Sequence, residues 1–131
     1  MLVKKNEFYE ITLINETNLQ ITTLKSTDLG VAYLLDYKGK TYYHAGDLNL
    51  WLWEEESAEY NENMTRKYFT QLKKIRGKEI DIAFVPLDSR QGKNAFTGMK
   101  SFLEYTNTKR VFPMHMWEEF SYIDKFLICI T

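Results

Sequence analysis

The segment Tyr43-His44-Ala45-Gly46-Asp47-Leu48-Asn49 separates two parts of the chain that have different sequence patterns. Before it, runs rich in β-branched and aromatic residues alternate with turn residues, which is typical of strands. We place these strands at residues 8–14, 19–24, 31–37 and 40–44. Lys38-Gly39 predicts a tight hairpin turn between the last two. The first third of the chain is therefore predicted to be an antiparallel meander.

After Glu54 the apolar residues recur at helical spacing. One predicted helix carries Tyr60, Met64, Tyr68, Leu72 and Ile75 on one face, and Gly77 marks its end. A short apolar strand follows at 80–85, a second helix at about 94–105, and another strand at 109–112. Strands that alternate with helices in this way pair in parallel. The predicted fold class is α/β, with a mixed sheet made of the meander and then βαβ units.

Composition limits the class of protein. The 131 residues fit one domain spanning 1–131, and 17 basic against 18 acidic residues lack the basic excess of nucleic-acid binders. No apolar run approaches the roughly 20 residues that span a bilayer, and we expect no secretory signal. The single cysteine, Cys129, excludes an internal disulfide and fits a reducing compartment. We therefore expect a cytoplasmic protein without nucleic-acid or membrane partners.

Three loops follow predicted strands and hold the residues best suited to chemistry. They are residues 44–49, 85–90 and 111–117, and both histidines and all three tryptophans lie in or beside them. Functional residues collect at the C-terminal ends of parallel strands, so these loops are expected at one edge of the sheet. Asp and His side chains that converge there suit zinc, iron or manganese.

Three motifs of the chain, taken together and in their order along the sequence, resemble the metallo-β-lactamase (MBL) superfamily. They match its branch of predicted metal-dependent hydrolases, which has a His-Ala-Gly-Asp-Leu-Asn loop and a tryptophan pair. The motifs are residues 43–49 with Trp51 and Trp53, residues 80–88, and Val111-Phe112-Pro113-Met114-His115. The resemblance covers the whole chain but only the C-terminal half of the family's fold. It implies half of an αββα sandwich, with helices on the outer face of the sheet.

The resemblance also implies metal ligands. Asp47 matches the aspartate that bridges two metal ions, and His115 matches the last histidine ligand. The implied cofactor is a divalent metal, with zinc first and iron or manganese as alternatives. Such a metal pair would lower the pKa of a bridging water and direct the hydroxide at an ester, amide or phosphodiester of a small-molecule substrate.

The family's main ligand motif, His-x-His-x-Asp-His, is absent from this chain. Catalytic zinc takes about three protein ligands, whereas Asp47 and His115 are only two. Further candidates, as residues that support the ligands or line a pocket, are His44, Asp28, Asp88, Trp51 and Trp53. We expect the lone chain to be incomplete or inactive, so whether it is an enzyme stays open.

Several of these candidates also have a purely structural interpretation. His44 is typical of a structural histidine, and Trp51 and Trp53 suit core or interface packing as well as a pocket wall. Asp88 and Arg90 either contact a substrate or form a solvated pair in a loop, which is the commoner arrangement.

Half of a sandwich leaves one sheet face uncovered. We expect aromatic and aliphatic residues there, of the kind of Tyr33, Leu35, Tyr43, Phe84 and Phe112. Because a large exposed apolar face is unusual on a monomer, we expect a homodimer or a complex with a complementary N-terminal half. The sequence does not distinguish a natural short protein from a split or truncated one.

Three functions remain open. The chain is a hydrolase half that is active with its complement, or a non-catalytic structural or binding half-domain. Alternatively, it is a homodimer that holds metal with two Asp47 and two His115 side chains, a reasonable ligand set for zinc or iron.

Overall fold

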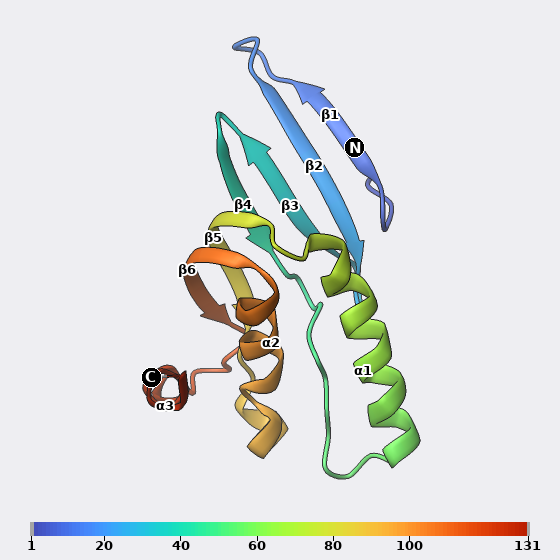
Figure 1. The fold of residues 1–131 in the computed structure, drawn as a ribbon, viewed down its shortest axis with the longest axis vertical. Coiled ribbons are helices and arrows are strands. Elements are labelled where there is room, and N and C mark those ends of the chain that lie inside the picture. The colour runs from blue at the N-terminus through green and yellow to red at the C-terminus, as the bar shows by residue number, and fades with distance from the viewer. Residues whose placement is uncertain (1, 131) are drawn as a thin grey trace.

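The computed structural model describes residues 2–130, with only the backbone for 129 and 130, and contains one six-stranded sheet (Figure 1). The strands lie across the sheet in chain order. They are β1 (Phe8–Thr12), β2 (Asn18–Lys25), β3 (Val31–Tyr37), β4 (Lys40–His44), β5 (Glu79–Pro86) and β6 (Asn107–Met114). Strands β1 to β4 pair antiparallel, whereas β5 lies parallel to both β4 and β6. The predicted meander followed by parallel units is confirmed.

Turn residues set the strand ends. Lys38 and Gly39 have φ angles of 48° and 74°, as a two-residue turn of type I′ between β3 and β4 requires. Strand β1 ends at Thr12, two residues before the predicted end. The Asn15 side chain accepts the Thr17 N–H at 3.2 Å, and this local bond competes with further strand pairing.

The helices begin and end close to the predicted positions. Helix α1 (Ala58–Leu72) is capped by Ser57, whose Oγ accepts the Tyr60 N–H at 3.1 Å, and the 3-10 turn η1 (Lys73–Ile75) extends it. The second predicted helix, at about 94–105, corresponds to α2 (Thr97–Tyr105), and the 3-10 segment η2 (Ser89–Asn94) precedes it. A third helix, α3 (Ser121–Ile130), follows β6. Within residues 2–130, every helix is too short or too polar to cross a membrane.

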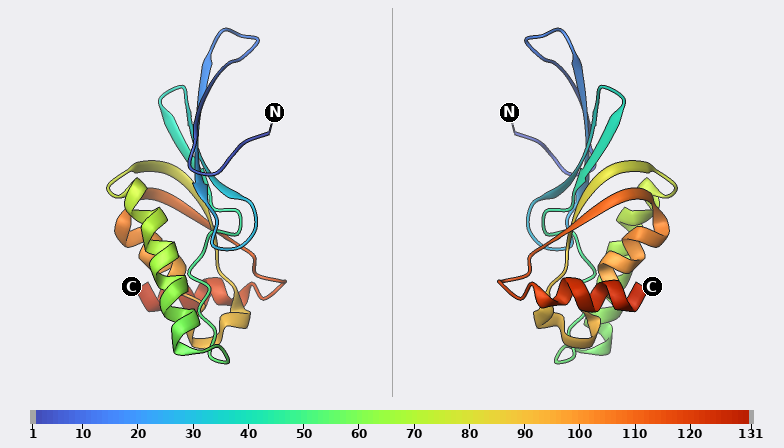
Figure 2. Two further views of the ribbon diagram at one scale, coloured as in Figure 1. Left: turned by 90° about the vertical axis from the view of Figure 1, so that its right-hand side faces the viewer. Right: turned by 90° about the vertical axis from the view of Figure 1, so that its left-hand side faces the viewer.

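Helices α1 and α2 cover the same face of the sheet (Figure 2). Tyr43 of β4 is 2 % exposed and stacks on Phe102 of α2 with the ring centroids 4.7 Å apart. The Tyr68 hydroxyl of α1 donates to the Gly98 carbonyl at 2.8 Å, which joins the two helices. Helix α3 lies at the end of the molecule and packs Phe126 against Phe96.

The opposite sheet face is partly exposed. The pairing aligns His44, Phe84 and Phe112 on β4, β5 and β6, and the two phenylalanine rings stack at 5.6 Å. Phe84 is 39 % and Phe112 47 % exposed. Tyr33 pairs with His44 and so lies on this face too, as does Leu35. The expectation that Tyr43 lies there is wrong, because side chains alternate along a strand and Tyr43 faces the helices.

Candidate metal and substrate site

The ends of the three parallel strands bring Asp47, Asp88 and His115 together. Asp47 follows β4 after Gly46, which has a φ of 55°. A Cβ at Gly46 would lie 2.7 Å from the Val31 carbonyl oxygen, so glycine is required there. His115 follows β6 directly with a φ of 69°, a left-handed conformation that turns its ring back over the sheet edge.

His115 lies between the two carboxylates. Its Nδ1 is 3.1 Å from Oδ2 of Asp88, and its Nε2 is 3.2 Å from Oδ1 of Asp47. An ionised carboxylate only accepts hydrogen bonds, and a neutral imidazole donates just one. Both contacts are therefore satisfied together only when the imidazole is protonated or when a cation is shared between Nε2 and Asp47. Two ligands of a tetrahedral zinc ion stand about 3.4 Å apart at ordinary bond lengths, close to the Nε2–Oδ1 separation.

Asp88 is buried and holds both His115 and Arg90 in place. Its side chain has no exposed surface, and Arg90 binds both carboxylate oxygens, at 2.6 Å through a terminal nitrogen and at 3.0 and 3.1 Å through Nε. Burial raises the pKa of Asp88, but hydrogen bonds from Arg90 and His115 outweigh this effect and lower the pKa below its ordinary value. Asp88 is therefore ionised at neutral pH and keeps the proton of His115 on Nδ1. The expectation of a solvated Asp88–Arg90 pair is wrong for Asp88.

The two tryptophans support the site and also border it. The indole N–H of Trp51 donates to the Asp47 carbonyl at 2.8 Å, and its ring lies 5.2 Å from that of His115. Trp53 stacks on Trp51 at 6.0 Å with nearly parallel rings. Trp51 is 5 % exposed and belongs to the core, so both interpretations of this residue hold.

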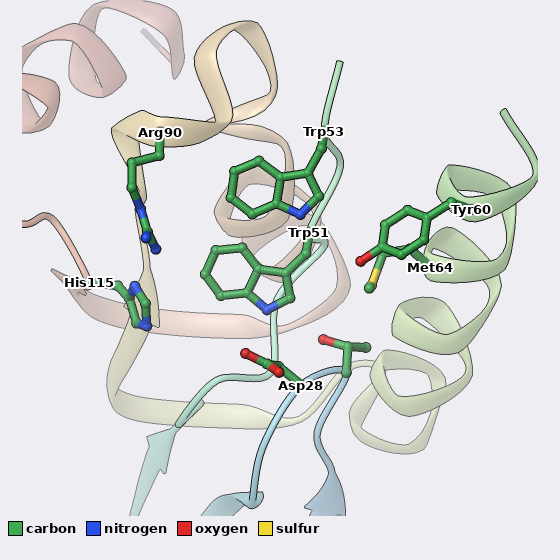
Figure 3. Close-up of a pocket in the computed structure, with 8 residues that line it drawn as sticks. Asp28, Trp51, Trp53, Tyr60, Met64, Arg90 and His115 are labelled. Atoms are coloured by element: carbon green, nitrogen blue, oxygen red, sulfur yellow. The ribbon is translucent and has the colours of Figure 1, made fainter. Parts of the chain in front are cut away.

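A pocket of about 160 Å³ opens beside His115. Figure 3 shows the two indoles with His115 and Arg90 to one side and α1 to the other, from which Tyr60 and Met64 point inward. Asp28 reaches the wall from the loop between β2 and β3. The structure thus places His115, Asp28 and both tryptophans around one space.

His44 is not part of this group. It lies on the sheet face away from the helices, with its ring 5.9 Å from that of Phe84. Its Nδ1 accepts the Gly46 N–H at 3.1 Å, so the ring supports the turn that carries Asp47. Asp47 and His44 are only three residues apart, but β4 ends between them. His44 lies on the exposed sheet face, whereas Asp47 lies at the sheet edge beside His115.

The donor types of this group suit a divalent metal ion. Throughout residues 2–130, no group of three or more His, Cys, Asp or Glu side chains is placed to hold a metal ion. Asp47 and His115 are two suitable donors, and Asp88 orients the imidazole as carboxylates commonly do for metal-bound histidines. Within residues 2–130 the donor types fit a metal ion, but Asp47 and His115 supply two ligands and not a complete set.

Sequence reasoning missed the role of Trp117. Its ring lies 5.8 Å from that of His115, and the Arg90 guanidinium stands 4.8 Å above it. Trp117 follows His115 by two residues, and this closeness in sequence is the signal from which a contact with the site could be predicted. Tyr60 and Met64 were assigned to the packing face of α1, and their part in the pocket depends on how that helix lies against the tryptophans.

The comparisons with known proteins agree with this fold. No protein-family model and no curated protein matches the chain. A solved structure from Thermotoga maritima, described as a predicted Zn-dependent hydrolase of the MBL superfamily, is similar with a TM-score of 0.52 and 18 % sequence identity. The match covers 97 % of this chain and 57 % of that one. The chain thus has the fold of about half of an MBL hydrolase, which confirms the predicted fold class.

Proposed function

We propose that this chain is one half of a metal-dependent hydrolase of the MBL type. The observation that carries the proposal is the position of His115, whose Nε2 faces Asp47 while Nδ1 is fixed by buried Asp88. The similarity to a structure described as a Zn-dependent hydrolase supports it. In this proposal zinc is the preferred ion, and the protein acts in the cytoplasm, in keeping with its single cysteine.

Each residue has a distinct part in this proposal. Asp47 and His115 donate to the metal, Asp88 holds the imidazole in position, and Arg90 keeps Asp88 ionised. A zinc ion bound there would supply a water of lowered pKa for attack on a small-molecule substrate. Trp51 and Trp53 border the space beside His115 where such a substrate would lie.

The remaining ligands would come from outside this half of the fold. The chain spans 57 % of the length of its structural neighbour. The sheet face with Phe84 and Phe112 is exposed and aromatic, and it is suited to a complementary N-terminal half or to a second copy. A homodimer could share a metal between the Asp47 and His115 residues of both chains.

A second candidate is a non-catalytic half-domain that associates through this sheet face. The exposure of Phe84 and Phe112 favours it, because this face can associate whether or not Asp47 and His115 hold a metal. The two candidates differ in metal content.

The test is elemental analysis by plasma mass spectrometry after incubation with zinc and gel filtration, with the native mass measured on the same sample. In the homodimer form of the proposal two chains complete the ligand set, so the wild type should retain zinc and Asp47→Ala and His115→Ala should lose it. Asp81→Ala changes an aspartate that bonds Lys109 and the Thr41 backbone away from the site, so it is the matched control and should keep its zinc. Retention of one or two ions per dimer would support the shared site. A metal-free oligomer would exclude the shared site and leave the complex with an N-terminal half or the non-catalytic half-domain.

A further inference from the structure

The pocket beside His115 has room for a small chemical group. Its volume is about 160 Å³. An engineered apolar cavity of about 150 Å³ accommodates benzene, whereas drug-sized ligands occupy at least about 300 Å³. The pocket is therefore suited to one headgroup of a larger molecule or to a very small ligand.

Tryptophan, tyrosine and methionine side chains make up four of the eight residues that line the wall. Trp51 and Trp53 stand side by side, and Tyr60 and Met64 face them from α1 (Figure 3). Trp51 and Met64 are 5 % and 7 % exposed, so this part of the wall is held by the core. Aromatic rings attract cations through their negative faces, and tryptophan does so most strongly.

The charges of the wall also favour a cation. Asp28 is its one acidic residue, and Arg90 its one residue of the Lys and Arg type. The Arg90 guanidinium is paired with both oxygens of buried Asp88 and lies over Trp117, so its charge is already matched. His115 also lines the wall, but both of its ring nitrogens face carboxylates, so among the described residues of the wall Asp28 is the one charged side chain without a hydrogen-bonded partner.

The loop that carries Asp28 is fixed to the body of the protein. Ser26 Oγ accepts the Asp28 N–H at 3.0 Å, and Thr27 Oγ donates to the Asn49 carbonyl at 2.6 Å. Asn49 is buried and bonds to Gln91, which in turn bonds to the Leu50 carbonyl. The backbone that carries the Asp28 side chain is therefore fixed beside the tryptophans by a connected set of hydrogen bonds.

We propose that this pocket binds a small ammonium headgroup, with the tryptophans and Tyr60 around the cation and Asp28 as its counter-charge. Quaternary ammonium groups are commonly bound by such aromatic residues. The binding itself is independent of hydrolysis. The further statement that the headgroup belongs to the substrate, with the scissile bond toward His115, rests on the proposed hydrolase function.

The test compares choline with 3,3-dimethyl-1-butanol, a neutral molecule of the same shape. Both are titrated into the full 131-residue chain in the presence of EDTA, with calorimetry and tryptophan fluorescence as readouts. We expect choline to bind at least about fivefold more tightly than the neutral molecule, the size of effect that a partly exposed cation–π contact provides. Equal affinities, no binding of choline at millimolar concentration, or tighter binding of benzoate would each overturn the proposal.

Variants separate this proposal from the hydrolase proposal. Asp28→Asn should weaken choline binding by about fivefold and leave the neutral molecule unaffected. Asp124→Asn, on α3, is the matched control and should bind choline as the wild type does. Asp47 is outside the pocket wall, so Asp47→Asn should lose zinc retention but keep choline binding. A wild type that binds choline selectively but retains no zinc would count against the hydrolase alone, and a wild type that retains zinc but does not select choline would count against the headgroup pocket alone.

Discussion

The Nδ1 atom of His115 lies 3.1 Å from Oδ2 of Asp88, a carboxylate with no exposed surface. This contact sets which nitrogen of His115 carries the proton, because an ionised carboxylate accepts and never donates. The other nitrogen is then free to face Asp47, 3.2 Å away. Buried Asp88 thus orients the His115 ring so that Nε2 faces Asp47.

Replacing Asp88 tests this relationship. We expect Asp88→Asn to weaken zinc binding by about 10- to 100-fold, as for other residues that orient a metal-bound histidine. Isothermal titration with zinc measures the change. Asp81→Asn removes an aspartate that bonds Lys109 and the Thr41 backbone, away from the site, and is the matched control. Equal zinc affinity in the two variants would contradict the assigned role.

Acid should weaken the fold through Asp81. The Lys109 side chain and the Thr41 N–H lower the pKa of Asp81 from 3.8 to about 2. Because the pKa is lower in the folded state, its contribution to stability is fully present above about pH 4 and is lost as the pH falls toward 2. Urea unfolding at several pH values measures this effect. The free energy of unfolding should fall less steeply between pH 4 and about pH 2 in Asp81→Asn than in the wild type. An unchanged slope would exclude this contribution.

Gly98 should tolerate no side chain. A Cβ there would lie 1.8 Å from Oδ1 of Asn49 and 3.2 Å from the Leu50 nitrogen. We expect Gly98→Ala to destabilise the protein by about 3 kcal/mol, at the upper end of what overpacking costs. Chemical denaturation measures this value, and Ser101→Ala in the same helix is the control. In an Asn49→Ala background the penalty for Gly98→Ala should shrink, and strictly additive effects would refute the clash.

The exposed sheet face should mediate association. We expect the wild type to sediment as an oligomer at micromolar concentration and Phe84→Gln/Phe112→Gln to sediment as a monomer, because the exchange removes the two stacked rings. Phe8→Gln, at an exposed position of β1 that is 57 % exposed, is the control. A wild type that sediments as a monomer would contradict this prediction.

Local sequence signals determined the elements and their order. Period-two runs, the Lys38-Gly39 turn and the helical spacing from Tyr60 to Ile75 depend on neighbours along the chain, so they could be identified from the sequence. The order of strands and helices then predicted which strands pair in parallel. The meeting of Asp47, Asp88 and His115 at one sheet edge follows from this topology.

The directions and burial of the side chains on these elements depend on long-range packing. His44 and Tyr43 are adjacent, yet the pairing of β4 sends His44 to the exposed face and Tyr43 into the core. The burial of Asp88 depends on the packing around the end of β5, and the pocket joins Asp28, the tryptophans and α1 from distant parts of the chain. Burial and proximity of this kind arise from long-range packing, which a local pattern of residues does not encode.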